Sequence, residues 1–466
     1  MKLYGRMTFY LLLAVAVILP ACSKSSFLDK KSDTRLVVPT TLADFQLLLD
    51  NQYVMQETPE LGELSADNFY MTYSVWQSVF LKEQNAYLWA KDIYESQGQV
   101  PDWDIPYQQV FYANVVLDGL SKLKVDGSNQ VQWNTIKGTA LFLRAYAFYN
   151  ISQVFAPMYD SATAANDLGI PLRLNSDVNQ KSVRAFVKGT YDTILSDLKQ
   201  AANLLPTAVL KDSLNRPSQP AALALLARVC LSARAYDQAW TYANSCLQLY
   251  DSLMMYKTLA TIGTILPFPQ NNTETLYQSV LLSTSEVLGG IFKTADIVDS
   301  NLYASYAPGD LRRIAFYKPP NANNQVNLKG SYNGRSYCFS GLAIDEVFLI
   351  RAECAARAGN RDAALADLNH LLQYRWDSTF VPVIAATALD ARDSILVERR
   401  KELAFRGLRW SDLRRLNKEG AGIAIYHGWN GQVKRLSAGS PNYVLPIPPD
   451  VLNISGMQDN PRVDPN

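Results

Sequence analysis

Residues 225–244 read LLARVCLSARAYDQAWTYAN, and residues 349–369 read LIRAECAARAGNRDAALADLN. Placed under one another, the two stretches align Ala227 with Ala352, Ala233 with Ala358, Asp237 with Asp362 and Ala239 with Ala364. Each stretch is typical of a helix, a tight turn and a second helix, and small residues at the matched positions let the two helices approach closely. The alignment therefore predicts tetratricopeptide-like helical hairpins.

One such hairpin cannot bury its apolar face alone, so we expect further copies. Residues 139–155 are rich in alanine and aromatic residues, and residues 187–206 carry a helical apolar stripe that ends at a proline. Residues 397–417 are a candidate for the last pair, and few stretches alternate as strands do. The sequence predicts an all-α scaffold of about four hairpins.

Two less regular segments interrupt this pattern. Residues 58–106 are rich in aromatic side chains, and residues 253–341 are rich in Asn, Ser, Gly and Tyr. The second segment is too long to be a structureless loop inside a compact domain, so we expect it to be folded and functional. Because no sharp break in composition occurs, we expect residues 22–466 to form a single domain.

The first residues have the layout of a secretory signal, with Lys2 and Arg6 before a hydrophobic run over residues 7–19. Residues 19–22 read LPAC and look like a bacterial lipobox, whose cleavage after residue 21 leaves Cys22 as a lipidated first residue. Its acyl chains would anchor the protein in a membrane. The alternative is an ordinary signal peptide with a small residue near its cleavage site.

Composition excludes several classes of function. Lys and Arg number 44 against 43 for Asp and Glu, and a net charge of +1 argues against nucleic acid as a partner. His370 and His427 stand far apart, without a carboxylate or cysteine at ligand spacing, so we expect no histidine base, metal site or cofactor. The remaining cysteines are expected mostly as buried free thiols, although an exported compartment permits disulfides; they are Cys230, Cys246, Cys338 and Cys354.

Ordered motifs along the chain resemble the SusD/RagB family of outer-membrane nutrient-binding lipoproteins. They are CSKSSFLD (22–29), WDIPYQQVFYAN (103–114), LRAYAFYNISQVF (143–155), GIPL (169–172), RPSQPAALALLARVCL (216–231), DEVFLIRAECAARAGN (345–360), ERRKELAFRGLRWSDLRRL (398–416) and YVLPIPPDVL (443–452) followed by MQDNP (457–461). The likeness covers nearly the whole mature chain. It implies a cell-surface lipoprotein of the outer membrane, which captures an oligosaccharide and delivers it to a SusC-like TonB-dependent transporter.

The sequence departs from the family pattern at three places. Arg406 stands where the family usually has glutamate, and Ala343 stands where it often has arginine, three residues before Glu346. We expect Arg406 to find another carboxylate. The residues after Cys22 are Ser, Lys, Ser and Ser, without the acidic cluster that often accompanies surface export, so the surface and periplasmic faces of the membrane both stay open.

Residues 397–417 concentrate charge on what we expect to be helices. The residues of this ion-pair motif are Glu398, Arg399, Arg400, Glu402, Arg409 and Asp412. If the helical face packs between neighbouring hairpins, the arginines would form bidentate bonds to carboxylates and fix how the helices dock. The alternative is a basic patch for an anion or nucleic acid. Because acidic residues are interleaved, we favour the structural interpretation.

Sugars present apolar CH faces that stack on Trp and Tyr, and hydroxyls that bind Asn, Asp, Gln and Arg. The more exposed candidates for ligand contact are Asp67, Asn68, Tyr70, Tyr73 and Trp76, and, in the second irregular segment, Tyr306, Tyr317, Tyr332 and Tyr337. The spacing of three between Tyr70, Tyr73 and Trp76 also fits a helix stripe turned inward. We expect Trp89, Trp103 and Trp410 in the core.

Two other classes of protein share these features. A helical-toroid glycosidase would need two carboxylates roughly 5 to 10 Å apart across a cleft, for which Asp67 and Asp310 are candidates. A tetratricopeptide-like scaffold would hold a peptide instead of a glycan. We favour a binding protein that is not an enzyme, because no catalytic constellation is recognisable and the family motifs point to binding.

Overall fold

The computed structural model describes residues 39–95, 98–259, 261–290 and 294–465. All the helices and strands of the described residues lie in one compact unit, Thr41–Asn466. The signal segment, Cys22 and the boundary predicted after residue 21 lie outside the described residues. Among the described residues, no helix combines the length and the apolar character that crossing a membrane requires.

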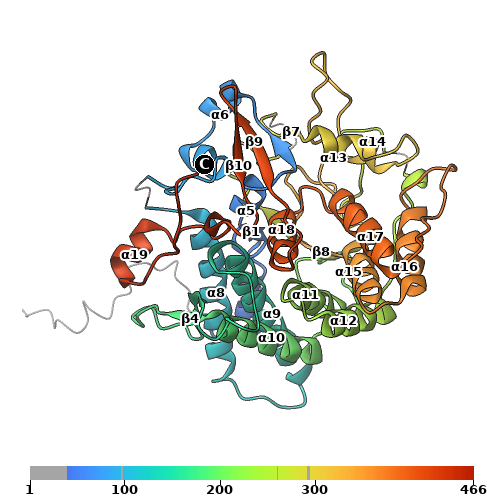
Figure 1. Cartoon of the computed structure of the whole chain (residues 1–466). Helices are drawn as coiled ribbons and strands as arrows, with labels where there is room; N and C mark the ends of the chain where they lie inside the picture. The colour runs from blue at the N-terminus through green and yellow to red at the C-terminus, as the bar shows by residue number, and fades with distance from the viewer. Residues whose placement is uncertain (1–38, 96–97, 260, 291–293, 466) are drawn as a thin grey trace, which may run out of the picture. The chain divides into compact units, whose positions relative to one another are not determined.

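The prediction of an all-α hairpin scaffold is confirmed, because long helices follow one another and each packs against the next (Figure 1). They are α8 (Pro101–Leu120), α9 (Gln130–Phe155), α10 (Val187–Leu204), α11 (Gln219–Ser232), α12 (Tyr236–Leu249), α15 (Ile344–Arg357), α16 (Arg361–Gln373) and α17 (Ala388–Glu402). The scaffold ends with α18 (Arg409–Lys418), which also contacts α11.

The two stretches that align in sequence form matching hairpins, α11–α12 and α15–α16. Two of the three aligned alanine pairs are fully buried between the helices, Ala227 with Ala352 and Ala239 with Ala364. The third pair follows the first helix of each hairpin, where Ala233 is half-buried and Ala358 is exposed. The turns match as well, because Arg234 and Gly359 occupy equivalent positions and both have positive φ, +61° and +83°. A left-handed residue at this point lets the chain reverse within a few residues.

Shorter helices flank the scaffold. They are α3 (Leu42–Leu49), α4 (Gln52–Met55), α5 (Leu61–Leu64), α6 (Tyr73–Ser78), α7 (Leu81–Tyr87), α13 (Ser300–Ala304), α14 (Arg312–Phe316) and α19 (Pro449–Ser455). Helix α3 begins at a capping box, in which Thr41 and Asp44 exchange hydrogen bonds with each other's backbone N–H. It packs on α8 and α9 through Phe45, which lies against Gly119.

The two irregular segments pair with one another through very short strands. Strand β1 (Glu57–Thr58) runs parallel to β6 (Val280–Leu281), and β2 (Phe69–Tyr70) runs antiparallel to β7 (Ile297–Val298). The other pairs are β3 (Leu168–Pro171) with β4 (Arg184–Phe186), β5 (Thr275–Tyr277) with β8 (Leu342–Ala343), and β9 (Ile425–Trp429) with β10 (Gln432–Leu436). The second irregular segment is therefore folded.

A large apolar core joins the scaffold helices to these segments. Trp89, Trp103 and Trp410 are buried, as the sequence predicts. The cysteines are free and buried, which agrees with the expectation of unpaired thiols; they are Cys230, Cys246, Cys338 and Cys354.

A network of ion pairs, which we call the charged interior, lies where α17 and α18 meet the second irregular segment. Arg312 is fully buried and reaches Asp310 at 2.6 Å, Glu398 at 2.6 Å and Glu402 at 3.0 Å. Arg375 bridges Glu402 at 2.7 Å and Glu274 at 2.9 Å. Burial raises the pKa of Glu402, but the Arg375 and Arg312 guanidinium groups outweigh it and hold that pKa below its usual range.

The charged interior continues into α18. Arg399 reaches Asp412 at 2.8 Å, and Arg415 bridges Asp412 and Glu353 at 2.8 and 2.7 Å. Arg406, which stands where the family usually has glutamate, also lies in the charged interior. It pairs with Asp345 at 2.6 Å, so the expectation that it finds another carboxylate is confirmed. Its guanidinium also lies over the rings of Tyr332 and Phe339, 4.6 and 5.0 Å from their centroids.

Candidate functional site

Three aromatic side chains meet beside the β9–β10 hairpin, and we call them the aromatic platform: Tyr73, Trp76 and Trp429. The rings of Tyr73 and Trp76 stack with centroids 5.6 Å apart and an interplanar angle of 13°. Trp429 meets Tyr73 and Trp76 edge-on, at 6.0 and 5.5 Å and with interplanar angles of 81°. Figure 1 shows α6 beside this hairpin, at one edge of the molecule.

Helix α6 presents two of the platform residues. Thr72 caps it by accepting a hydrogen bond from the Val75 N–H, and none of its residues is buried. Tyr73 and Trp76 are three positions apart, so they share one face of the helix. The Trp76 indole N–H donates to the Gln84 carbonyl at 3.0 Å, which fixes this ring against α7. Tyr73 keeps 37% of its surface exposed.

The β9–β10 hairpin presents the third ring. It turns at Asn430 and Gly431, whose φ angles of +47° and +73° fit the tight turn that Asn-Gly favours. The register places Trp429 opposite Gln432, and His427 opposite Lys434. Directly opposed residues of an antiparallel pair share a face, so these four side chains belong to the side of the hairpin that faces α6.

His427 anchors the hairpin to the body of the protein. Its ring is fully buried and sandwiched between Tyr87 and Trp89, with centroids 4.0 and 4.5 Å away. Its two ring nitrogens lie 2.6 Å from the Tyr87 carbonyl oxygen and 3.0 Å from that of Ala66. Burial lowers the pKa of His427, and the two carbonyl oxygens oppose that shift. Because Trp429 is two residues away on the same face, this anchor holds the platform in place.

Asp67 and Asn68 are bound to other side chains of the protein, Asp67 to Arg409 and Asn68 to Glu63. Arg409 holds Asp67 with bonds of 2.6 and 2.9 Å; burial raises the pKa of Asp67, but Arg409 and Arg400 outweigh it and lower that pKa to about 2. Asn68 is buried and donates to Glu63 at 2.6 Å. The expectation that Asn68 is exposed is therefore wrong. Both residues directly precede β2, in which Tyr70 is half-buried.

Three of the predicted tyrosines in the second irregular segment are buried, so their expected exposure is wrong. The Tyr306 and Tyr317 hydroxyl groups lie 2.9 Å apart, and Tyr306 also donates to the Lys401 carbonyl at 2.7 Å. Tyr332 donates to the buried carboxylate of Glu274. These rings pack against the charged interior, because guanidinium groups and aromatic faces attract each other. Tyr337 keeps 39% of its surface exposed.

Trp429 is missing from the candidates for ligand contact that the sequence indicates. The signal for it was present, because residues 425–436 read IYHGWNGQVKRL, with Asn-Gly between two runs that favour strands. The hairpin can be predicted from that pattern. Its position beside α6 depends on the contacts of His427, which no local pattern reveals.

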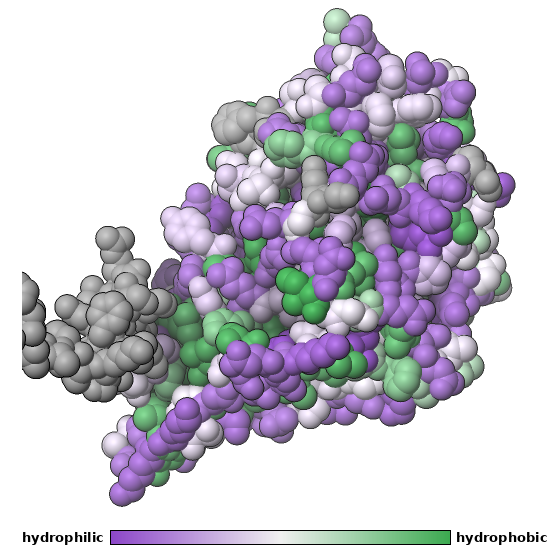
Figure 2. Space-filling model, turned by 90° about the vertical axis from the view of Figure 1, so that its left-hand side faces the viewer, coloured by the Kyte–Doolittle hydropathy of each residue, from purple (hydrophilic) through white to green (hydrophobic). Residues whose placement is uncertain are grey.

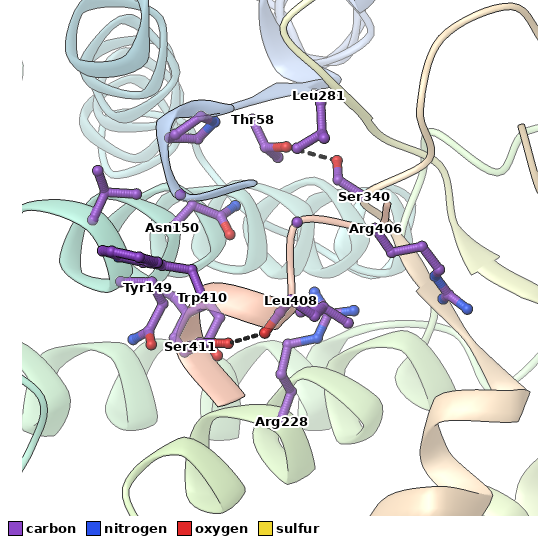
Figure 3. Close-up of a pocket in the computed structure, with 15 residues that line it drawn as sticks. Thr58, Tyr149, Asn150, Arg228, Leu281, Ser340, Arg406, Leu408, Trp410 and Ser411 are labelled. Atoms are coloured by element: carbon purple, nitrogen blue, oxygen red, sulfur yellow. Dashed lines mark hydrogen bonds between the residues drawn. The ribbon is translucent and has the colours of Figure 1, made fainter. Parts of the chain in front are cut away.

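A small cavity inside the protein offers a second place for a ligand (Figure 3). It has a volume of about 30 Å³ and its lining includes Asn150, Arg228 and Trp410. Arg228 is already bound to Glu346 and to the Gly341 carbonyl oxygen, and Arg406 turns its guanidinium away from the cavity. This volume suits water molecules, since one water needs roughly 10–15 Å³. The cavity is too small for a sugar.

A larger hollow of about 350 Å³ lies between α8, the loop after β3 and α19. Its lining is mainly apolar and includes Phe111, Val178 and Ile454. Figure 2 shows the face of the molecule that carries α19, where apolar residues gather in a hollow flanked by polar ones. Few polar side chains there are free to bind sugar hydroxyls, because Asn114 donates to the Arg173 and Asn175 carbonyls.

The two carboxylates considered for glycosidase chemistry, Asp67 and Asp310, are bound to cations. Asp310 is buried against Arg312 and Lys401, at 2.6 and 3.0 Å, and Asp67 is bound to Arg409. Burial raises the pKa of Asp310, but Arg312 outweighs it and lowers that pKa. Among the described residues, no group of three His, Cys, Asp or Glu side chains is placed to hold a metal ion.

Comparison with known families identifies the chain. Residues 26–231 match a SusD-like family described as "Starch-binding associating with outer membrane", and residues 328–461 match the SusD/RagB family, described as "SusD family". The two matches together cover well over half of the chain. No curated protein matches the sequence at a significant level.

Solved structures share the fold. A SusD superfamily protein from Bacteroides thetaiotaomicron superposes with a TM-score of 0.72 at 22% identity, over 91% of this chain and 100% of that one. One from Bacteroides vulgatus gives 0.73 at 20% identity, over 91% and 99%. A laminarin-binding SusD-like protein gives 0.64 at 19% identity, over 90% and 98%. With both family matches and this fold, the chain belongs to the SusD/RagB family.

Proposed function

We propose that this protein binds an oligosaccharide on the aromatic platform, without cleaving it, and delivers it to a SusC-like TonB-dependent transporter in the outer membrane. The family description names starch binding and association with the outer membrane. A structural relative is named for laminarin binding. Both support a glycan as the ligand, in preference to a peptide.

The arrangement of the platform carries this proposal. Tyr73 and Trp76 are stacked and Trp429 stands nearly perpendicular to them, so the three rings form a corner. A sugar ring can lay its apolar CH face on one ring and its edge against another. Polar side chains border the rings, since Gln432 lies opposite Trp429 and is exposed. Such a surface binds sugars and needs no reacting group.

The absence of cleavage is part of the proposal. The two carboxylates considered for glycosidase chemistry, Asp67 and Asp310, are each bound to arginine, which favours their charged form. A general acid would need a proton near neutral pH, which requires a raised pKa. Both pKa values are lowered instead.

The anchor and the partner complete the proposal. Acylation of Cys22 would hold the protein in the outer membrane, facing the cell exterior, where a transporter could receive the glycan. Incorporation of labelled palmitate into the wild type, and its loss in Cys22→Ala, tests the anchor. Co-purification of a TonB-dependent transporter with the tagged full chain tests the partner.

Calorimetry with a panel of oligosaccharides tests the binding site. We expect Trp429→Ala to weaken binding of the best oligosaccharide by at least about 10-fold, because one stacking ring contributes roughly 1–3 kcal/mol. Trp240→Ala is the matched control, since Trp240 lies on α12, away from α6, and is 41% exposed (Figure 1). Equal effects of the two substitutions, or release of reducing sugar by the wild type, would overturn the proposal.

A further inference from the structure

A lysine to which the described residues offer no acidic partner stands at the edge of the aromatic platform. Lys434 Nζ lies 5.8 Å from the centroid of the Trp429 ring. None of the carboxylates in the described part of the chain lies within 4.0 Å of this ammonium group. Cations within residues 397–417 differ from Lys434, because Arg400 and Arg409 both reach Asp67, and Lys401 reaches Glu398 and Asp310.

The hairpin sets the direction of this lysine. Lys434 is opposite His427 in the register, and His427 is buried against the body of the protein. Lys434 therefore belongs to the face of the hairpin that carries Trp429, and it is half-buried. Arg435, the next residue, is opposite the exposed Tyr426 and points to the other face.

We propose that the platform takes an acidic oligosaccharide, one that carries a carboxylate or sulfate group, and that Lys434 receives this anion while the rings stack on the sugar. This inference rests on the proposed function and names its class of ligand. An ammonium group beside an aromatic ring is less hydrated on the side of the ring, so an anion placed there gains more than it would at a fully exposed lysine. The anion would also supply the acidic partner that is absent from the described part of the chain.

Two adjacent substitutions test the proposal. Lys434→Gln and Arg435→Gln each remove one positive charge from the same strand, but only the first charge lies on the platform face. The probes are oligogalacturonides, alginate oligosaccharides and chondroitin sulfate oligosaccharides. Each is compared with a derivative whose carboxylates are methyl-esterified, and the chondroitin derivative is also desulfated so that no anion remains. Laminarin oligosaccharides serve as the neutral reference, and binding is measured by calorimetry.

For an acidic probe that binds, we expect Lys434→Gln to weaken affinity by about 10-fold and Arg435→Gln by less than about 2-fold. For the esterified derivative, the wild type and Lys434→Gln should have the same affinity. Lys434→Arg should restore most of the affinity, because it keeps the charge. Rising salt concentration should weaken acidic-probe binding in the wild type more than in Lys434→Gln. Thermal unfolding of each variant checks that the fold is kept.

The outcomes separate this inference from the proposed function. If the protein binds laminarin or another neutral oligosaccharide but none of the acidic probes, the inference is overturned and the proposed function stands. Equal losses in Lys434→Gln and Arg435→Gln would also overturn it. If no oligosaccharide binds at all, both the inference and the proposed function fail.

Discussion

The charged interior and the aromatic platform are built in opposite ways. In the charged interior, Arg312, Arg375 and Glu402 are fully buried, and each cation meets two or more oxygen atoms at about 3 Å or less. On the platform, rings contact one another near the surface, and Lys434 has an aromatic neighbour in place of an acid. The region with the most charge in the sequence therefore fixes the scaffold, whereas a region with little charge is left open for a ligand.

Glu402→Ala should have the largest effect on stability. It leaves Arg312 and Arg375 buried with one fewer carboxylate, and breaking a buried pair of this kind costs about 3–5 kcal/mol. Urea unfolding measures this loss. Asp192→Ala is the control, because its pair with Lys188 is exposed and screened by solvent, so its loss should change stability little. Similar losses in both variants would mean that burial does not distinguish the charged interior from a surface pair.

The scaffold was predictable because its signal is local and repeated. Ala227 and Ala352, at equivalent positions in sequence, are both buried between paired helices. The turns of the two hairpins match as well, because Gly359 in one and Arg234 in the other both have positive φ. Periodicity and small residues determine such hairpins, so one sequence is enough to find them.

The candidate site was only partly predictable. Tyr73 and Trp76 lie on one helical face, and the sequence placed them together. The burial of Tyr306 and Tyr317 involves a contact with a distant helix, because Tyr306 donates to the Lys401 carbonyl in α17 and its hydroxyl lies beside that of Tyr317. The irregular segments join through strands of two residues. Contacts between residues far apart in the chain leave no periodic pattern, so exposure in these segments could not be inferred from spacing.

The turn between α17 and α18 offers a second test of the charged interior. Gly407 has φ of +73°, and a Cβ there would lie 3.0 Å from Leu281 Cδ2. Gly407→Ala should lower the free energy of unfolding by about 1–2 kcal/mol, since other residues are strained in this conformation. Gly189→Ala, in helix α10 with open space around it, should instead raise stability by roughly 0.5–1 kcal/mol. If Gly407→Ala raised the free energy of unfolding, the inference that this turn requires glycine would be wrong.

A buried acid outside the charged interior should make stability depend on pH. Burial raises the pKa of Asp296 to about 8, and nearby donors and Lys318 oppose this only in part. Between about pH 4 and that value, the folded protein holds a proton that the unfolded chain has released. The free energy of unfolding should therefore fall as pH rises, by at most about 1.4 kcal/mol per pH unit.

Asp296→Asn should remove this contribution, because an amide does not titrate. Urea unfolding at a series of pH values from 5 to 8 gives the comparison. The difference in stability between the variant and the wild type should grow with pH in favour of the variant. A difference that stays constant over this range would mean that Asp296 is charged in the folded protein, like the acids of the charged interior.

The smallest effect should come from the hydroxyl group of Tyr73. If the platform acts through ring faces, Tyr73→Phe keeps the stacked pair with Trp76 and should change oligosaccharide affinity by less than about 2-fold. Tyr73→Ala removes the ring and should weaken binding by about 10-fold. Calorimetry with the best oligosaccharide of the panel separates the two variants. An equal loss in both would assign the contribution to a hydrogen bond from the hydroxyl, and the platform would then resemble the charged interior in depending on polar contacts.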